Sequence, residues 1–407
     1  MSEWKKVKLG EVTEYITDGD HQPAPKSEQG VYFIKIKDII NNRISFDNAL
    51  HVPSEYYAKL KNNRKAVKGD VLYTVVGSYG TATYVNTELP FCFERNIALL
   101  HANQEINSYF LYLLMSCESF YKKADALANG AAQKLISLKK LQTIEIEIPP
   151  LATQHRIATI LSRYDSLIEN YQKQIKLLEE AAQRLYKEWF VDLRFSGHEN
   201  TNIIDGVPEG WEKKTIDDVT CKITTGLNPR KNFVLGKGSN YYVTIKNMAD
   251  NTLFLDDRCD RVDNEALEKI NKRSDLKIGD ILFSGIGTIG RVALVDIPTN
   301  NWNVSESVFT LRANDIVTKE FLYLMLLSPD MQNYCQSNAH GAAQKGIRMA
   351  DLKAYSFNLP PFGVIQKFTN LVTPTIKKVS SIRNQIRLLT EARDRLLPKL
   401  MSGEIAV

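Results

Sequence analysis

The chain has 407 residues, 43% of them hydrophobic and 24% charged, with a formal net charge of +5 at pH 7. These proportions suit a globular protein of two or three domains, and no apolar run approaches the roughly 20 residues that a membrane helix needs. Because the first residues hold no apolar signal region, we expect a cytoplasmic protein.

Short strands and helices alternate in the first part of the chain. Residues 31–36, 70–76 and 97–100 are rich in β-branched or aromatic side chains and are bounded by Gly, Asn or Lys, which predicts strands. Residues 108–122 form a helical stretch. The same order returns later, with strands expected at 241–245, 280–283 and 308–311 and a helix at 318–327.

The two parts of the chain repeat each other. Trp4 and Trp211 open the two copies 207 residues apart, and the step Gly-Asp-(Val/Ile)-Leu recurs at Gly69 and Gly279. Gly-Ala-Ala-Gln-Lys and Pro-Pro each recur 211 residues apart. Two like halves predict a two-fold-like molecule with a two-part target. The expected blocks are residues 1–150, a helical segment 151–205, residues 206–361, and a second helical segment 362–407.

A long amphipathic helix is predicted after each Pro-Pro pair. Apolar residues follow each other in steps of four and three, which is the seam of a heptad repeat. The seam residues of the two helices are Ile157, Leu161, Ile168, Ile175, Leu178 and Leu185, and Val372, Val379, Ile382, Ile386, Leu389 and Leu396. Pro374 is expected to kink or start the second helix, and Gly197 and Gly403 to follow the helix ends. Arg393 is a polar seam position, which marks either a subunit contact or a frayed end.

Each of these helices would expose an apolar stripe if it stood alone. The nearest partner for each helix is the other, because a tethered helix has a high effective concentration; a homodimer is the alternative. The second helix must return from the second block, so the pair is expected to be antiparallel, with one block at each end. This predicts an α+β fold of two similar mixed blocks separated by a coiled coil. Such a molecule could hold two readers apart on DNA.

Several motifs of catalysis are absent or incomplete. The five cysteines are scattered, with no Cys-x-x-Cys pair, so we expect neither a disulfide framework nor a metal centre. Gly285 to Gly290 spells G-x-G-x-x-G, but an expected strand follows it where a dinucleotide site needs a helix, which favours a tight turn. Asn358-Leu359-Pro360-Pro361 interrupts the Asn-Pro-Pro-aromatic motif of adenine methyltransferases with a leucine, and no phosphate-binding loop of ATPases occurs.

The repeated segments resemble the specificity subunits of type I restriction-modification systems over the whole chain. The resemblance rests on the two Trp-initiated segments, on the Gly-Asp-(Val/Ile)-Leu steps, and on Pro149-Pro150-Leu151-Ala152-Thr153-Gln154. Leu389-Thr390-Glu391-Ala392-Arg393 and Leu400 to Glu404 complete it. The second copy has one extra residue before its Gln366, which leaves the start of the second helix open.

This resemblance implies the function of each part. The blocks would be two target recognition domains that read the halves of an asymmetric DNA site, and the helices would be spacers. The spacers would also dock two modification (methyltransferase) subunits, which recruit restriction subunits. The chain would have no catalytic site, no metal and no cofactor of its own; S-adenosylmethionine, ATP and Mg²⁺ would belong to the partners.

Side chains with forked donors and acceptors on expected loops are the candidates for DNA contact. In the first block these are His21, Gln22, Lys26, Lys37, Asn41, Arg43, Arg64, Ser78, Tyr79, Arg95, Asn96, Gln133 and Lys134. In the second block they are Asn228, Arg230, Lys231, Lys237, Lys246, Asn247, Thr288, Arg291, Gln344, Lys345 and Arg348. For each of them, a solvated surface residue or a structural loop is the alternative.

Charge alone does not select the DNA-binding function. The basic excess lies in residues 362–407, with eight basic and three acidic side chains, and not in the two blocks. Two other classes therefore stay open: a coiled-coil scaffold or orphan DNA-binding protein without a methylation partner, and a single-chain methyltransferase or nuclease. Binding of S-adenosylmethionine by the chain would favour the enzyme, and salt-insensitive or absent DNA binding would favour the scaffold.

Overall fold

The computed structural model describes residues 4–77, 79–130, 134–249, 251–341 and 345–407. It divides into two compact units, Met1–Asn170 with Ile386–Val407, and Tyr171–Gln385. Each long helix is therefore divided between the two units. The sequence had instead predicted that the helices are separate segments from the blocks. Within the described residues, no helix has the length and hydropathy that crossing a bilayer requires.

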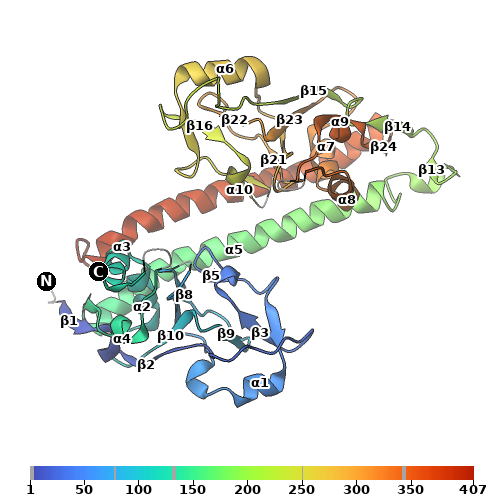
Figure 1. Cartoon of the computed structure of the whole chain (residues 1–407). Helices are drawn as coiled ribbons and strands as arrows, with labels where there is room; N and C mark the ends of the chain where they lie inside the picture. Colours follow the sequence, from blue (N-terminus) through green and yellow to red (C-terminus); the bar gives the residue numbers. More distant parts are fainter. Residues whose placement is uncertain (1–3, 78, 131–133, 250, 342–344) are drawn as a thin grey trace. The chain divides into compact units, whose positions relative to one another are not determined.

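The first unit is built from small β-sheets with helices packed on them (Figure 1). Its strands are β1 (Lys5–Lys8), β2 (Thr13–Asp18), β3 (Val31–Ile34), β4 (Ile39–Ile40), β5 (Arg43–Ile44), β6 (Leu50–Val52), β7 (Val71–Thr74), β8 (Ala82–Tyr84), β9 (Phe91–Phe93), β10 (Ile97–Ala102) and β11 (Glu145–Ile148). Its helices before the first long helix are α1 (Ser54–Lys59), α2 (Ser108–Ser116), α3 (Glu118–Leu127) and α4 (Leu138–Gln142).

The second unit repeats this order. Its strands are β12 (Ile203–Ile204), β13 (Val207–Pro208), β14 (Glu212–Thr215), β15 (Thr220–Thr225), β16 (Asn240–Val243), β17 (Met248–Ala249), β18 (Thr252–Leu253), β19 (Asp260–Val262), β20 (Ile281–Ser284), β21 (Val292–Leu294), β22 (Trp302–Val304), β23 (Val308–Ala313) and β24 (Ser356–Leu359). Its helices, apart from the long ones, are α6 (Asn264–Ser274), α7 (Lys319–Leu326), α8 (Pro329–Ser337) and α9 (Met349–Ala354).

The sheet topology is the same in both units. An antiparallel sheet has the order β2-β10-β7-β8 in the first unit and β15-β23-β20-β21 in the second. A three-stranded sheet has the order β6-β3-β9 or β19-β16-β22, and its pairs β3–β9 and β16–β22 are parallel. The strands are short and largely buried, as the apolar runs predicted, because both faces of these sheets meet hydrophobic clusters. The expected internal repeat and the mixed α/β blocks are confirmed.

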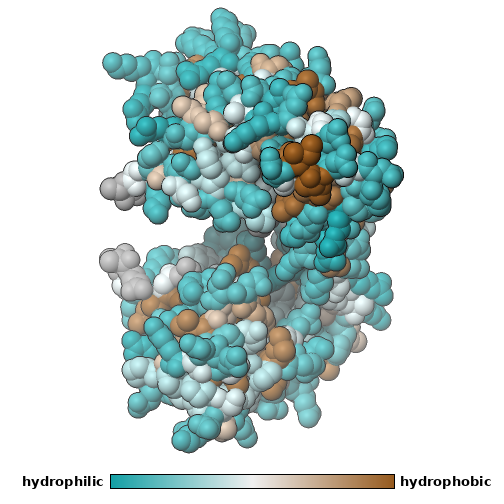
Figure 2. Space-filling model, turned by 90° about the vertical axis from the view of Figure 1, so that its right-hand side faces the viewer, coloured by the Kyte–Doolittle hydropathy of each residue, from teal (hydrophilic) through white to brown (hydrophobic). Residues whose placement is uncertain are grey.

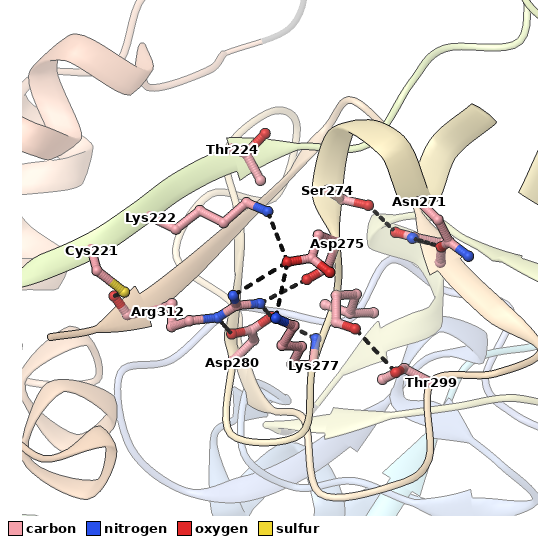
Figure 3. Close-up of polar contacts among 12 residues, drawn as sticks. Cys221, Lys222, Thr224, Asn271, Ser274, Asp275, Lys277, Asp280, Thr299 and Arg312 are labelled. Atoms are coloured by element: carbon pink, nitrogen blue, oxygen red, sulfur yellow. Dashed lines mark hydrogen bonds and ion pairs between the residues drawn. The ribbon is translucent and has the colours of Figure 1, made fainter. Parts of the chain in front are cut away.

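The repeated Gly-Asp-(Val/Ile)-Leu step holds a buried carboxylate at the start of a central strand. Asp70 accepts the Val67 N–H and Asp280 accepts the Lys277 N–H, each at 2.8 Å. The partner side chain differs between the units. His101 Nδ1 lies 2.6 Å from Asp70, whereas the Arg312 guanidinium binds Asp280 with two nitrogens, at 2.6 and 2.9 Å. Figure 3 shows Arg312 and Lys277 gathered around Asp275 and Asp280.

Both long helices begin directly after the Pro-Pro pairs. Helix α5 spans Leu151–Phe190 and α10 spans Phe362–Met401. Pro374 therefore does not start the second helix, which is already helical twelve residues earlier. Gly197 and Gly403 follow the two helices, each with positive φ.

The Gln154 side chain fixes the start of α5. Its amide is almost fully buried, accepts the Asn107 N–H at 2.8 Å, and donates to the carbonyls of Glu105 and Pro149. In α10 the corresponding position is Ile365, which is fully buried, and Gln366 is exposed. The extra residue before Gln366 therefore leaves the helix start in place and replaces a polar anchor with an apolar one.

The two helices pair antiparallel inside each unit. In the first unit, Ile157 and Leu161 near the start of α5 share a buried cluster with Leu400 near the end of α10. In the second unit, Trp189 near the end of α5 packs with Phe368 near the start of α10, at a ring separation of 5.8 Å. All predicted seam residues are buried or partly buried. The seam residues are thus covered within one chain, as expected for pairing of the two tethered helices.

Arg393 is neither frayed nor on an outer face. Its Nη1 lies 2.6 Å from Asp165 Oδ1 on α5, and its guanidinium also contacts Asp394. Tyr109 of α2 donates its hydroxyl to the same Asp165 carboxylate. Arg393 therefore links the two helices inside the first unit through the Asp165 carboxylate, which also accepts the hydrogen bond from Tyr109.

The surface visible in Figure 2 is mainly hydrophilic, with apolar side chains in small groups. Scattered apolar residues of this kind are normal on globular proteins.

Candidate nucleic-acid interface

The loop after β2, and its counterpart after β15, leaves its sheet at a glycine that touches another strand. A Cβ atom on Gly19 would lie 2.0 Å from the Phe93 carbonyl oxygen, and one on Gly226 only 1.6 Å from that of Val304. Any side chain at either position would collide with backbone. These glycines of the repeat therefore let the loop cross the carboxyl end of β9 or β22.

Backbone hydrogen bonds and a parallel bridge between Asp20 and Glu94 gather five segments at this end of the parallel strands in the first unit. Glu94 N–H donates to the Ile34 carbonyl at 3.0 Å, Val75 N–H to Asn96 at 2.9 Å, and Ile136 N–H to Val75 at 3.2 Å. We call the described residues of 18–24, 35–45, 75–81, 94–96 and 129–137 the first loop rim.

The second unit has the matching arrangement. Ser305 N–H donates to Val243 at 2.8 Å, Gly285 N–H to Ser307 at 3.0 Å, and Ile347 N–H to Gly285 at 2.8 Å. The described residues of 225–231, 244–254, 285–291, 305–307 and 340–348 form the second loop rim. Most of the predicted DNA-contacting side chains thus lie on one frame in each unit, at the carboxyl ends of parallel strands, where α/β folds commonly bind ligands.

A 3-10 turn after the first parallel strand presents one lysine in each rim. In the turn Ile36–Asp38, the Asp38 carboxylate accepts the Lys35 N–H at 2.9 Å. In the turn Ile245–Asn247, the Asn247 side-chain oxygen accepts the Thr244 N–H at the same distance, 2.9 Å. Lys37 and Lys246 occupy the exposed middle position. Asn247, predicted to read bases, is only 2% exposed and serves as the cap of this turn. It does not present a forked amide at the surface.

The hairpin that follows carries Asn41 at its tip in the first rim. Asn41 and Asn42 connect β4 and β5 with φ of 50° and 60°, which suits a type I′ turn. Asn41 is exposed there. Arg43, two residues on, donates from Nη2 to the Asp165 carbonyl of α5 at 3.5 Å, so part of its guanidinium faces the helix.

Several predicted contacts in or beside the first rim are ion-paired. Arg64, which lies on the turn Asn62–Arg64, approaches Asp18 at 3.6 Å and Asp20 at 3.2 Å. His21 Nε2 lies 3.0 Å from Asp18, and Lys134 Nζ lies 2.5 Å from Asp125. These cations are therefore held by carboxylates of their own unit.

Asp20 is the carboxylate that fixes the loop after the glycine crossing. Burial by itself would raise the Asp20 pKa, but hydrogen bonds from the Gln22 N–H and the Tyr56 hydroxyl and the charge of Arg64 outweigh it. The pKa of Asp20 is therefore below its usual value. The group is charged at neutral pH and joins the loop to both of these side chains.

The tight turn predicted at Gly285 to Gly290 is confirmed in the second unit, where it connects the paired strands β20 and β21. Strand β21 follows Gly285 to Gly290, where a dinucleotide site would need a helix. In the first unit, Tyr79 is not displayed at the tip of the corresponding turn, because its ring packs on Tyr73 and its hydroxyl is buried; burial raises the Tyr79 pKa to about 12. Arg291 donates to the carbonyls of Ile245 and Met248, so it ties the turn to the neighbouring loop.

The remaining candidates divide into three groups. Exposed or partly exposed on the rims are Gln22, Arg95, Asn96, Asn228, Arg230, Lys231, Thr288, Lys345 and Arg348. Lys26 and Lys237 are exposed but belong to loop segments near the amino ends of β3 and β16, where Ser27 pairs with His51 and Gly236 with Arg261. Ser78, Gln133 and Gln344 lie outside the described residues.

The sequence interpretation missed Arg273. It lies near the end of α6, is exposed, and donates to the Thr225 hydroxyl at 3.2 Å, beside the glycine crossing of the second rim. Arg273 corresponds to Arg64, 209 residues earlier. The repeat itself could have identified it, since Arg64 was among the candidates.

In the part of the chain that the structure describes, no three His, Cys, Asp or Glu side chains gather in a way that could hold a metal ion.

Two copies of one frame with different loops match a known family. The model of the type I restriction modification DNA specificity domain matches residues 1–180 and 208–386. The chain belongs to this family. Each matched segment of this type I specificity chain contains one loop rim and most of one long helix.

Similar proteins carry the same family name. The chain is 26% identical to the type I restriction enzyme MjaIX specificity subunit of Methanocaldococcus jannaschii, over 99% of this chain and 93% of that protein. It is 24% identical to the HindI specificity subunit of Haemophilus influenzae over the full length of both. The crystal structure of a type I S subunit from M. genitalium superposes with a TM-score of 0.60 at 18% identity, covering 98% of this chain and 96% of that one. This last likeness concerns the fold.

Proposed function

We propose that this chain is the DNA sequence-recognition subunit of a type I restriction-modification complex. Each loop rim would read one half of an asymmetric two-part site in double-stranded DNA. The observation that carries the proposal is that both rims are held by matching backbone hydrogen bonds, yet their exposed side chains differ. A common frame with different side chains is what two readers of different half-sites require.

The helices would have two roles in the complex. As spacers, α5 and α10 would set the gap between the half-sites. They would also dock two modification subunits, which in turn recruit restriction subunits. The chain itself would be non-catalytic, with S-adenosylmethionine, ATP and Mg²⁺ bound by the partner subunits.

Methylation mapping tests this function. The full chain would be produced together with a type I modification subunit from the same organism, and methylated adenines would be mapped across the host DNA. A single motif of two short, different half-sites at a fixed gap is the expected result. Absence of methylation from an intact complex supplied with S-adenosylmethionine would contradict the proposal and favour a scaffold.

A variant assigns the rims to the half-sites. Exchanging residues 225–231 for residues 18–24 alters the second rim after its glycine crossing, and leaves the first rim intact. We expect one half-site of the methylated motif to change or be lost while the other stays. A change in both half-sites would show that the rims do not read independently.

A further inference from the structure

The two rims differ in a systematic way that the repeat makes visible. At five positions the first unit carries a carboxylate on or beside its rim where the second carries a neutral side chain. The pairs are Asp18 and Thr225, Asp20 and Leu227, Asp38 and Asn247, Glu94 and Ser305, and Asp125 and Gln336.

In the first unit these carboxylates neutralise three cations on or beside the rim, whereas no ion pair within the described residues involves the rim cations Lys35 and Arg95. Arg64 contacts both Asp18 and Asp20. Lys37 Nζ lies 3.6 Å from Asp38, and Lys134 Nζ lies 2.5 Å from Asp125. To bind a phosphate, each of the three paired cations must first loosen a contact within the protein, which reduces the net gain in free energy.

In the second unit the corresponding cations face neutral groups. Arg273 meets the Thr225 hydroxyl, and Lys246 stands beside the amide of Asn247. Among the ion pairs within the described residues, none involves Lys246, Arg273, Lys345, Arg230 or Lys231.

The acidic residues that the second rim does have are few. Glu306, which stands where the first rim has Arg95, accepts a hydrogen bond from the Tyr242 hydroxyl, and Asp250 lies outside the described residues. The loop after the glycine crossing adds two cations, Arg230 and Lys231, at the positions where the first loop has Pro23 and Ala24.

We propose that the second loop rim is the main electrostatic anchor of the chain on DNA, and that the first rim contributes little sequence-independent affinity. This inference rests on the proposed function. Cations without a carboxylate partner at a rim attract the phosphates of any duplex, and each phosphate that is neutralised adds about 0.9 to the slope of log affinity against log salt. The first rim would then select sequence mainly through contacts to bases after the second rim has bound.

Two double variants at equivalent positions test the inference. Lys246→Ala with Lys345→Ala is compared with its matched control, Lys37→Ala with Lys134→Ala, in the full chain. The probe is a mixed-sequence DNA duplex of about three helical turns, titrated at several salt concentrations. We expect the second-rim variant to lower the salt slope by about 1.8 for two lost phosphate contacts. The first-rim variant should change the slope by less than about half of that.

The reverse experiment restores charge to the first rim. Asp38→Asn with Asp125→Gln introduces the amides that the second unit carries at these positions, so the amide at position 38 would keep the cap that Asn247 provides in the second unit. Lys37 and Lys134 are then released from their carboxylates, and we expect tighter, more salt-dependent binding of the same duplex. Circular dichroism of each variant checks that the fold is retained.

The outcomes separate this inference from the function it rests on. If the wild-type chain binds no duplex in a salt-dependent way, alone or with its modification subunit, the proposed function itself is contradicted. If the wild type binds but both lysine pairs reduce the slope equally, the unequal roles of the rims are contradicted while DNA binding stands. An Asp38→Asn, Asp125→Gln variant that binds no better than wild type also contradicts the inference.

Discussion

At the scale of single residues, the glycine crossings are the tightest contacts of the rims. Gly226→Ala would place a methyl group 1.6 Å from the Val304 carbonyl oxygen, so β22 or the loop must move. We expect the second unit to lose about 2–4 kcal/mol of stability, measured by urea unfolding. Gly363→Ala is the control, because its added methyl would meet nothing within 4 Å on α10, and it should be neutral or slightly stabilising.

The buried Asp70 predicts a pH-dependent component of stability. Burial raises the Asp70 pKa above 3.8, and hydrogen bonds with Val67 and His101 oppose this only in part. Between 3.8 and its folded pKa, the native state binds more protons than the unfolded state. The contribution of Asp70 is therefore complete below pH 3.8 and is lost as the pH rises through the folded pKa.

Thermal unfolding of wild type and Asp70→Asn across this range measures that component. As the pH rises from 3.8 through the folded pKa of Asp70, the Tm of the wild type should fall relative to the Tm of Asp70→Asn. Asp47→Asn, at an exposed position, is the control. Tm curves of wild type and Asp70→Asn that stay parallel at every pH would refute the assignment.

Sequence patterns placed most candidate side chains on the correct loops but could not foresee their individual partners. Asn247, Tyr79 and Arg291 have the chemistry of DNA contacts, and the structure uses them to cap a turn, to pack against a tyrosine and to bind carbonyls. These roles depend on neighbours 3 to 46 residues away, which residue type alone does not reveal. Arg273 shows the opposite case, since the repeat could have identified it through its counterpart Arg64, but only its contact with Thr225 placed it at the rim.

At the scale of elements, the start of α5 depends on a polar anchor and that of α10 does not. Gln154→Ala would leave the Asn107 N–H and two carbonyls without their partner. We expect a loss of about 2–4 kcal/mol for the first unit, since unpaired buried polar groups cost about 1–3 kcal/mol each before relaxation. Urea unfolding of this variant is to be compared with Gln366→Ala.

Gln366→Ala removes an exposed side chain at the nominally equivalent motif position, and its effect should stay within about 0.5 kcal/mol. Similar losses in both variants would mean that the Pro-Pro-Leu-x-x-Gln pattern has the same role in both helices. The Pro-Pro pairs predicted the start of α5, whereas the start of α10 was left open by the extra residue before Gln366 and by Pro374; both helices begin directly after their Pro-Pro pairs. The sequence motif could not predict which of Ile365 and Gln366 turns inward, because that depends on packing against the block.

At the scale of the whole molecule, each compact unit needs a part of the chain that is distant in sequence. Leu400 of α10 is buried among residues of the first unit. Truncation after Gln385 should therefore expose the cluster around Leu161, although all of residues 1–170 remain. Hydrogen exchange should rise in residues 4–170 and stay near wild type in residues 171–385.

Equal loss of protection in both units would contradict this division. Leu388→Ala provides a mild control, because Leu388 is half exposed on the same helix segment. The sequence repeat predicted two blocks and two helices correctly. Segment boundaries read along the chain could not predict that each helix belongs half to one unit and half to the other, because this follows from antiparallel pairing.

The glycine crossings also bear on how such a chain acquires new targets. Gly19 and Gly226 fix where each loop leaves its sheet, whatever residues come next, and the hydrogen bonds of the rims involve backbone atoms. Side chains beyond the crossing that do not hold the loop, as Asp20 does in the first unit, can therefore be replaced without loss of the frame that presents them. A change of target would then require a handful of substitutions in one loop, and a duplicated frame offers two such loops that can diverge independently within one gene.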